Sequence, residues 1–145
     1  ARTEALIFAA SRAAHVEQVI QPALGRGDVV VCDRYIDSSV AYQGAGRNLG
    51  TDEVRSINEW ATGGLAPDLT VLLDVDPEAG RSRRTAADTA EDRLESEPDS
   101  FHGSIRSAFL ALAEDSPGRY LVLDAAAPVP ELAQKILARV QDLLA

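Results

Sequence analysis

Phe8 and Arg12 have the types and the spacing to hold a flat, polar molecule. They stand four positions apart in a segment, 3–24, whose apolar residues recur every three and four positions, so a helix projects both from one face. A phenyl ring can stack on a pyrimidine base, and the guanidinium group beside it offers several hydrogen-bond donors. Simple core packing of Phe8 is the alternative when the pair is taken alone.

A second group of polar residues, Asp33, Arg34 and Tyr35, directly follows an apolar run at 29–32. This run is rich in valine and predicts a strand buried on both faces. In an open parallel α/β sheet, ligands gather beyond the carboxyl ends of the strands, so the three residues are expected at the functional edge. Taken alone, Asp33 and Arg34 are equally well interpreted as a surface ion pair of little energetic value.

Short apolar runs and helical periodicities alternate along the rest of the chain. They predict strands at 69–75 and 120–124. They also predict a helix capped by Thr51 that runs through Trp60 to a stop at Gly63 and Gly64, and a helix capped by Asp76 with Pro77 at its first position. Two more helices are expected at about 98–114 and from Pro130. Residues 34–50 are expected as a loop or irregular helix, and 85–92 as a mobile loop. The alternation indicates an α/β fold with a parallel sheet covered on both faces, in one domain over 1–145.

Composition excludes several classes of protein. The net charge of −9 over 145 residues argues against a non-specific DNA or RNA binder, which needs a basic stripe, although a few local arginines can still bind a small anion. No apolar run approaches the roughly 20 residues of a membrane span. The single cysteine, Cys32, allows no internal disulfide and is expected as a small buried hydrophobe. A reducing cytoplasm is the natural setting.

The segment from Asp33 to Gly44, Asp-Arg-Tyr-Ile-Asp-Ser-Ser-Val-Ala-Tyr-Gln-Gly, resembles the signature of thymidylate kinases. That signature is an Asp-Arg-aromatic followed by a small hydroxyl residue and Ala-Tyr-Gln-Gly. Three further segments resemble the same family in the right order: Phe-Ala-Ala-Ser-Arg at 8–12, Pro-Asp-Leu-Thr at 67–70 and Asp-Arg-Leu-Glu at 92–95. The resemblance therefore covers nearly the whole chain.

The resemblance implies phosphoryl transfer from ATP to dTMP, giving dTDP, with Mg²⁺. It also implies the three-layer α/β/α parallel sheet of P-loop kinases, whose five strands run in the order 2-3-1-4-5, here without the first two. The family's ATP site uses a loop of the type Gly-x-x-x-x-Gly-Lys-[Ser/Thr], and 1–145 contain no such pattern. We expect this loop upstream of residue 1, and we expect 1–145 alone to be inactive.

The resemblance implies that different residues bind the pyrimidine base and the phosphate of dTMP. Phe8 stacks on thymine, and Arg12 contacts the base or the region of the neighbouring phosphate. Arg34 grips the monophosphate bidentately, as guanidinium groups do well. Asp33 orients that arginine and helps arrange Mg²⁺ through water.

The same resemblance assigns roles to four residues that follow the Asp-Arg pair. Ser38 and Ser39 supply hydroxyls near the nucleotide. Tyr42 lies beside the deoxyribose, where a ribose 2′-hydroxyl would clash. Gln43 gives its amide to the edge of the base.

A lid is expected at about 81–95. Its arginines, Arg81, Arg83 and Arg84, reach phosphates as charge passes between donor and acceptor; a basic helix end that suits the macrodipole is the plainer interpretation. Glu95 is a magnesium-side carboxylate by family position, and a solvated helix acid is its alternative.

The sequence also leads to an expected partner and to two alternative functions. The resemblance suggests a homodimer through the first helix and the helix around Trp60. A deoxynucleoside kinase, which shares the fold, would prefer thymidine to dTMP as acceptor. A catalytically inactive nucleotide-binding or dimerisation module would lack the glycine-rich loop natively.

Overall fold

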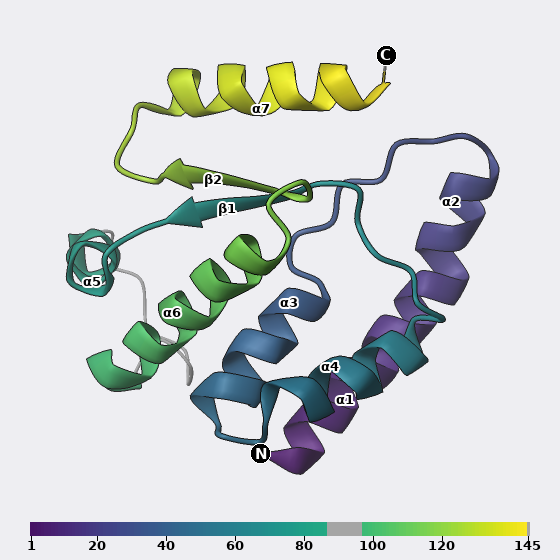
Figure 1. The fold of residues 1–145 in the computed structure, drawn as a ribbon, viewed down its shortest axis with the longest axis horizontal. Coiled ribbons are helices and arrows are strands. Elements are labelled where there is room, and N and C mark those ends of the chain that lie inside the picture. The colour runs from purple at the N-terminus through teal and green to yellow at the C-terminus, as the bar shows by residue number, and fades with distance from the viewer. Residues whose placement is uncertain (87–96, 145) are drawn as a thin grey trace. The chain divides into compact units, whose positions relative to one another are not determined.

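The computed structural model describes residues 1–86 and 97–144, and the chain divides into two compact units, Ala1–Ala66 and Pro67–Ala145 (Figure 1). We refer to them as unit 1 and unit 2. The expectation of one domain over 1–145 stays a prediction. Within the described residues, no helix is both long and apolar enough to cross a membrane.

Unit 1 begins with one long helical run, as the periodicity of 3–24 predicts. It consists of α1 (Arg2–His15), a widened π-helical turn η1 (Val16–Ile20) and α2 (Gln21–Gly25) (Figure 1). Pro22, which has no backbone N–H to donate, lies two residues past the widened turn. The residues of this run that are buried lie at helical spacing: Ala5, Ala9, Val16 and Ile20.

The second half of unit 1 is also helical. It contains α3 (Ile36–Ser39), the π-helical η2 (Val40–Gly46) and α4 (Thr51–Ala61), so 34–50 are largely an irregular helix, one of the two expected forms. The prediction that Thr51 caps α4 is wrong by one residue. Thr51 is the first residue of the helix, and Gly50 occupies the cap position with a left-handed φ of 93°. The predicted stop is confirmed, since Gly63 and Gly64 both have positive φ. Helix α4 packs on α1, α3 and η2.

The predicted strand at 29–32 is not formed. The segment has no strand or helix assignment, Val31 is 93% exposed and Cys32 is exposed rather than buried. A strand obtains its backbone hydrogen bonds from a neighbouring strand, and no strand within the described residues pairs with this segment. An apolar run alone therefore predicted the wrong local structure here.

Unit 2 contains a parallel pair of strands, β1 (Thr70–Asp74) and β2 (Tyr120–Asp124), in register from Thr70 opposite Tyr120 to Asp74 opposite Asp124. Both strands and their parallel pairing confirm the prediction. The expected burial on both faces is wrong, because Leu73 is 48% and Val122 is 44% exposed.

Three helices complete unit 2: α5 (Pro77–Ala86), α6 (Asp99–Asp115) and α7 (Val129–Leu144). Asp76 caps α5 as predicted, since its Oδ1 accepts a hydrogen bond from the Glu78 amide at 3.0 Å. Helix α6 packs on both strands and α7 packs on β2, and Figure 1 draws these two helices on opposite sides of the strands. Of the loop predicted at 85–92, the first two residues are helical and the others lie outside the described residues.

Candidate functional site

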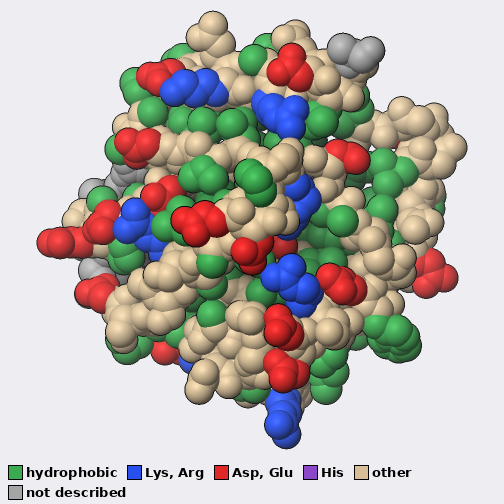
Figure 2. Space-filling model, in the orientation of Figure 1, with side chains coloured by type: hydrophobic (Ala, Val, Ile, Leu, Met, Phe, Trp, Pro, Cys, Tyr) green, Lys and Arg blue, Asp and Glu red, His purple; other side chains and the backbone are tan. Residues whose placement is uncertain are grey.

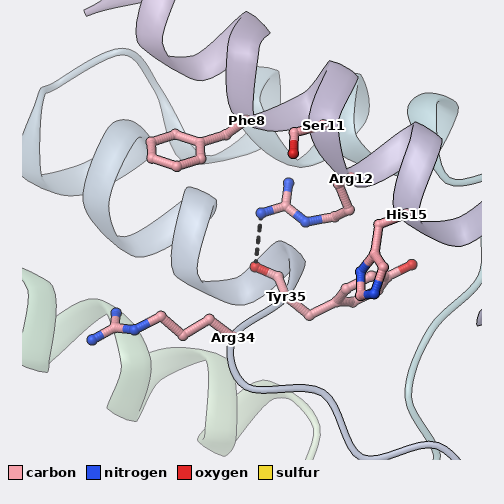
Figure 3. A pocket seen from close by; sticks show the side chains of 6 residues that line it. All are labelled: Phe8, Ser11, Arg12, His15, Arg34 and Tyr35. Carbon is pink, nitrogen blue, oxygen red and sulfur yellow. Dashed lines mark hydrogen bonds between the residues drawn. The ribbon is translucent and has the colours of Figure 1, made fainter. Parts of the chain in front are cut away.

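A pocket of about 170 Å³ opens on unit 1 (Figure 3). Helix α1 contributes four lining residues at helical spacing, and the segment before α3 contributes two more. The lining residues are Phe8, Ser11, Arg12, His15, Arg34 and Tyr35. The pocket therefore brings together the ring and the two guanidinium groups that the sequence singled out.

Phe8 projects from α1 to the edge of the pocket, where its side chain is seen beside the guanidinium of Arg12 (Figure 3). The residue is 42% exposed. This exposure argues against the alternative of simple core packing, and it leaves ring surface on which a planar group can stack.

The guanidinium of Arg12 is anchored by three hydrogen bonds to the protein. Nη1 donates to Asn58 Oδ1, and Nη2 donates to the Tyr35 carbonyl at 3.2 Å and to Ser39 Oγ at 3.1 Å (Figure 3 draws the bond to Tyr35). Burial lowers the pKa of Arg12 from its ordinary value, and the nearby Tyr35 partly offsets the effect. Arginine nevertheless remains charged at neutral pH, so the pocket has a fixed positive wall.

Tyr35 is held at both ends. Its carbonyl accepts the bond from Arg12, and its hydroxyl donates to the Leu65 carbonyl at 3.1 Å. The Arg12 guanidinium also lies over its ring, 5.7 Å from the centroid. Burial raises the pKa of the Tyr35 hydroxyl, while a hydrogen bond with the Thr62 side chain and the charge of Arg12 act in the opposite direction. Tyr35 thus links the pocket to the end of α4.

Arg34 has a φ of 68°, a left-handed conformation that costs a non-glycine residue about 1–2 kcal/mol. Such strain persists only where the surroundings impose it, and it is concentrated at functional sites. The guanidinium lies over the Tyr42 ring, 5.3 Å from its centroid, and the Arg34 carbonyl accepts from Cys32 Sγ at 3.3 Å. Figure 3 shows this side chain extended toward the side of the pocket where Phe8 lies.

The remaining residues predicted around the nucleotide differ in their placement. Asp33 is exposed and Ser38 is half-buried. Ser39 is buried against Arg12, and Tyr42 lies under Arg34. Gln43 is only 2% exposed and its Nε2 donates to Glu4 at 2.9 Å, so this amide is not among the groups that line the pocket.

The predicted lid residues are in unit 2. Arg81, Arg83 and Arg84 lie on α5, but their side chains and all of Glu95 lie outside what the structure describes. Among the described residues, no group of three or more His, Cys, Asp or Glu side chains is arranged to hold a metal ion.

Sequence reasoning missed Asn58, a fully buried residue of α4 that binds Arg12. The available signal was its position four residues after Val54 and four before Thr62, which puts a polar amide on the apolar face of a helix. His15 could have been found in the same way, because it stands seven positions after Phe8 on the pocket face of α1.

Gly44, the last residue of the Ala-Tyr-Gln-Gly signature, has a packing role. A Cβ at this position would lie 3.0 Å from the Cα of Thr51 and 3.2 Å from the carbonyl oxygen of Gly50. Both are backbone atoms at the start of α4, which cannot move aside as a flexible side chain would. The absence of a side chain at Gly44 therefore allows η2 and α4 to approach closely.

Comparison with known proteins agrees with the resemblance found in the sequence. Residues 1–136 match the thymidylate kinase family. The chain is 58% identical to the thymidylate kinase of Clavibacter michiganensis subsp. michiganensis over 144 residues, which are 99% of this chain and 68% of that protein. It is 56% identical to that of Leifsonia xyli subsp. xyli, over 95% of this chain and 65% of the relative.

A more distant match is 46% identical, to the thymidylate kinase of Lactobacillus helveticus, over 99% of this chain and 68% of that protein. The chain thus spans about two thirds of the length of the curated relatives it matches. A match over almost its whole length, at this identity, is far more than a shared fold requires. The chain belongs to the thymidylate kinase family.

Proposed function

We propose that this protein transfers a phosphoryl group from ATP to dTMP, giving dTDP, and that the pocket of unit 1 binds dTMP. The observation that carries the proposal is that Phe8, Arg12 and Arg34 line one pocket. Membership of the thymidylate kinase family and the names of the relatives support the reaction.

Phe8 and Arg12 form the base subsite in this proposal. The exposed ring of Phe8 stacks on thymine, and the charged guanidinium of Arg12 donates to the base or to the region of the neighbouring phosphate. Three of the five N–H groups of Arg12 already bind protein acceptors, so at most two are left for the nucleotide.

Arg34 binds the monophosphate. A guanidinium group meets two phosphate oxygens at once, and transfer of a phosphoryl group asks the protein mainly for position and positive charge. Asp33 precedes it in the exposed bend and orients it. The Tyr42 ring under Arg34 lies beside the deoxyribose.

Ser38 and Ser39 contribute hydroxyls at the nucleotide in the same proposal. Ser39 Oγ now accepts from Arg12, so its hydroxyl hydrogen remains to be donated. Gln43 would have to exchange its bond with Glu4 before its amide could reach the base.

Mg²⁺ is proposed with ATP. Magnesium keeps several waters and is usually bound through one or two carboxylates and the substrate's own phosphates, so an exposed acid such as Asp33 is a suitable donor. Asp33, through water, and Glu95 would hold the ion, which would neutralise charge on the phosphates.

Residues outside the pocket of unit 1 would bind ATP, the phosphoryl donor. We infer that the ATP phosphates bind a glycine-rich loop outside 1–145, and that Arg81, Arg83 and Arg84 belong to a lid at about 81–95. The parallel neighbours β1 and β2 correspond to the fourth and fifth strands of the order 2-3-1-4-5. The exposed Val29 and Val31 are consistent with a third strand whose neighbours belong to the part of the polypeptide outside 1–145.

We further propose a homodimer that forms through α1 and α4. Large apolar side chains are exposed on both helices: Leu6 at 56%, Ile7 at 63% and Trp60 at 86%. The net charge of −9 argues against DNA or RNA as a partner, and acidic and basic side chains are interspersed on the face shown in Figure 2.

The test uses the protein as its gene encodes it, with ATP and Mg²⁺ as donor system and either dTMP or thymidine as acceptor. Formation of dTDP from dTMP, with little product from thymidine, is the expected result. Preferential phosphorylation of thymidine would favour a deoxynucleoside kinase instead. Binding of dTMP without turnover in any of these mixtures would favour the inactive nucleotide-binding module.

A further inference from the structure

Asn58 is an unusual residue for the apolar face of a helix. It is fully buried in α4, with 0% exposure. Burying an amide is costly unless both of its ends find hydrogen-bond partners. Here Nδ2 donates to the Val54 carbonyl at 2.7 Å, and Oδ1 accepts from Arg12.

The bond to Val54 determines which way the amide faces. A backbone carbonyl can only accept, so it requires the nitrogen end of Asn58, and the oxygen end is then directed at the Arg12 guanidinium. A helix of unit 1 thus presents a fixed acceptor to a long side chain of another helix. Arginine has several rotatable bonds, and its orientation depends on such partners.

The three acceptors that bind Arg12 lie on different segments of unit 1. Asn58 lies on α4, Ser39 is the last residue of α3, and the Tyr35 carbonyl precedes α3. Nη2 uses both of its hydrogens on Tyr35 and Ser39, whereas Nη1 is held by Asn58 alone among the described residues. Without Asn58, the guanidinium could turn about the Nη2 contacts.

We propose that Asn58 is a positioning residue for nucleotide binding, which fixes the guanidinium plane of Arg12 so that its remaining N–H groups face the pocket beside Phe8. Its effect on dTMP rests on the proposed function. A group held in place before the ligand arrives loses less freedom on binding, so the amide acts on affinity without touching the nucleotide.

Two substitutions remove the acceptor in different ways. Asn58→Leu has nearly the same shape but leaves Arg12 Nη1 without a partner. Asn58→Ser keeps a hydroxyl that can donate to the Val54 carbonyl, as serine does within helices, but is too short to reach Arg12. Asn58→Asp retains the acceptor for Arg12 but loses the donor to the Val54 carbonyl, so it should lower Tm while it keeps Arg12 in place.

Steady-state kinetics on the protein as encoded separate positioning from stability. Asn58→Leu and Asn58→Ser should raise the KM for dTMP about tenfold, with kcat and the KM for ATP nearly unchanged. Asn58→Asp should stay within about threefold of the wild type. Val54→Ala is the matched control: it removes buried methyl groups from the same helix, so it should lower Tm while the KM for dTMP stays the same.

A double-mutant cycle asks whether the effect passes through Arg12. In an Arg12→Lys background, which lacks the paired Nη groups, Asn58→Ser should add little to the KM for dTMP. Additive effects in the two backgrounds would overturn the proposal. So would a wild-type KM in folded Asn58→Ser, or a rise in Val54→Ala equal to that in Asn58→Ser.

A measurement without substrate tests the role of Asn58 separately from the proposed reaction. Nitrogen-15 NMR of the Arg12 guanidinium should show restricted rotation about the Cζ–Nη1 bond in the wild type and faster rotation in Asn58→Ser. If the wild type fails to convert dTMP, the proposed function fails and this spectrum still decides whether Asn58 positions Arg12. Identical rotation in the two proteins would contradict the inference even if dTMP is turned over.

Discussion

Unit 1 and unit 2 use polar side chains differently. Unit 1 buries four polar side chains, Ser39, Gln43, Asn58 and Thr62, each at 2% exposure or less. Among the described residues of unit 2, two ion pairs are at least partly exposed: Arg106 pairs with Asp74 at side-chain exposures of 38% and 24%, and Lys135 pairs with Glu131 at 52% and 50%. Buried polar groups are costly and orient one another, whereas exposed pairs contribute little.

This difference predicts where substitutions act. In unit 1, two of the four buried polar side chains, Ser39 and Asn58, accept hydrogen bonds from Arg12, which lines the pocket. In unit 2, Arg106 Nε and Nη2 bind both carboxylate oxygens of Asp74, at 2.7 and 2.9 Å, at the end of β1. Changes to the unit 1 side chains that line the pocket or bind Arg12 should therefore alter nucleotide affinity, whereas changes among the described side chains of unit 2 should alter stability alone.

The strongest test of the comparison is Arg34→Gly. Loss of a bidentate, charge-assisted contact should weaken dTMP binding about 100-fold. Glycine adopts the φ of 68° without a Cβ penalty, which offsets the lost contact with Tyr42, so the free energy of unfolding should stay within about 1 kcal/mol of the wild type as binding is lost. Calorimetric titration with dTMP and thermal unfolding measure the two effects.

Asn48→Gly is the matched control, because Asn48 also has a positive φ, 55°, and does not line the pocket. It should gain stability and keep its affinity. Equal affinities of Arg34→Gly and the wild type would remove Arg34 from the phosphate subsite.

Phe8→Ala should have the next largest effect. Stacking of a base on an aromatic side chain is worth about 2 kcal/mol, which corresponds to roughly 30-fold in affinity. Stability should change little, since the residue is 42% exposed. Leu24→Ala, at 44% exposure on α2, is the control for loss of exposed apolar surface, and a comparable loss of affinity there would argue against stacking.

The sequence predicted different things well in the two units. In unit 2, the predictions of β1 and β2 are confirmed. Each is a short apolar run, and each pairs with the other in the same unit. In unit 1, the run at 29–32 is also short and apolar, but no strand pairs with it within the described residues. Local pattern identifies a segment able to form a strand, and only a neighbour makes it one.

For the candidate site the situation is reversed. Phe8, Arg12 and Arg34, which the motifs singled out, line one pocket, although the strand expected to carry Arg34 is not formed; their roles stay predictions. The partners of these residues could not be predicted in the same way. Asn58 meets Arg12 across 46 positions, and such a contact depends on how α4 packs on α1 rather than on any local spacing.

Glycine substitutions sharpen the comparison through packing. Gly44→Ala forces a Cβ to within 3.0 Å of the Thr51 Cα, so the free energy of unfolding should fall by about 1.5 kcal/mol. Gly103→Ala, in α6 of unit 2, has nothing within 4 Å of the added Cβ and should gain about 0.5–1 kcal/mol from helix propensity. Denaturant unfolding measures both, and a neutral Gly44→Ala would contradict the close approach of η2 to α4.

The smallest effect concerns the ion pair of unit 2 and its dependence on pH. The hydrogen bond from Arg106 lowers the pKa of Asp74 from its ordinary value, and burial of the carboxylate opposes this shift. In the unfolded chain Asp74 titrates near its ordinary value of about 3.9. Below that pH the unfolded chain takes up a proton that the folded chain does not yet hold, so unfolding becomes easier.

Arg106→Gln removes the cause of the shift. The stabilisation that depends on ionised Asp74 is complete above about pH 3.9 and is lost as the pH falls through the lowered folded value. The variant should therefore have a lower Tm than the wild type at neutral pH, and the difference should shrink below about pH 4. Lys135→Gln, which breaks the more exposed pair on α7, should change Tm less. A Tm difference for Arg106→Gln that persists undiminished in acid would show that Arg106 stabilises unit 2 by packing rather than through the charge of Asp74. The comparison of the two units depends on a distinction between buried and exposed polar groups, and this result would weaken it.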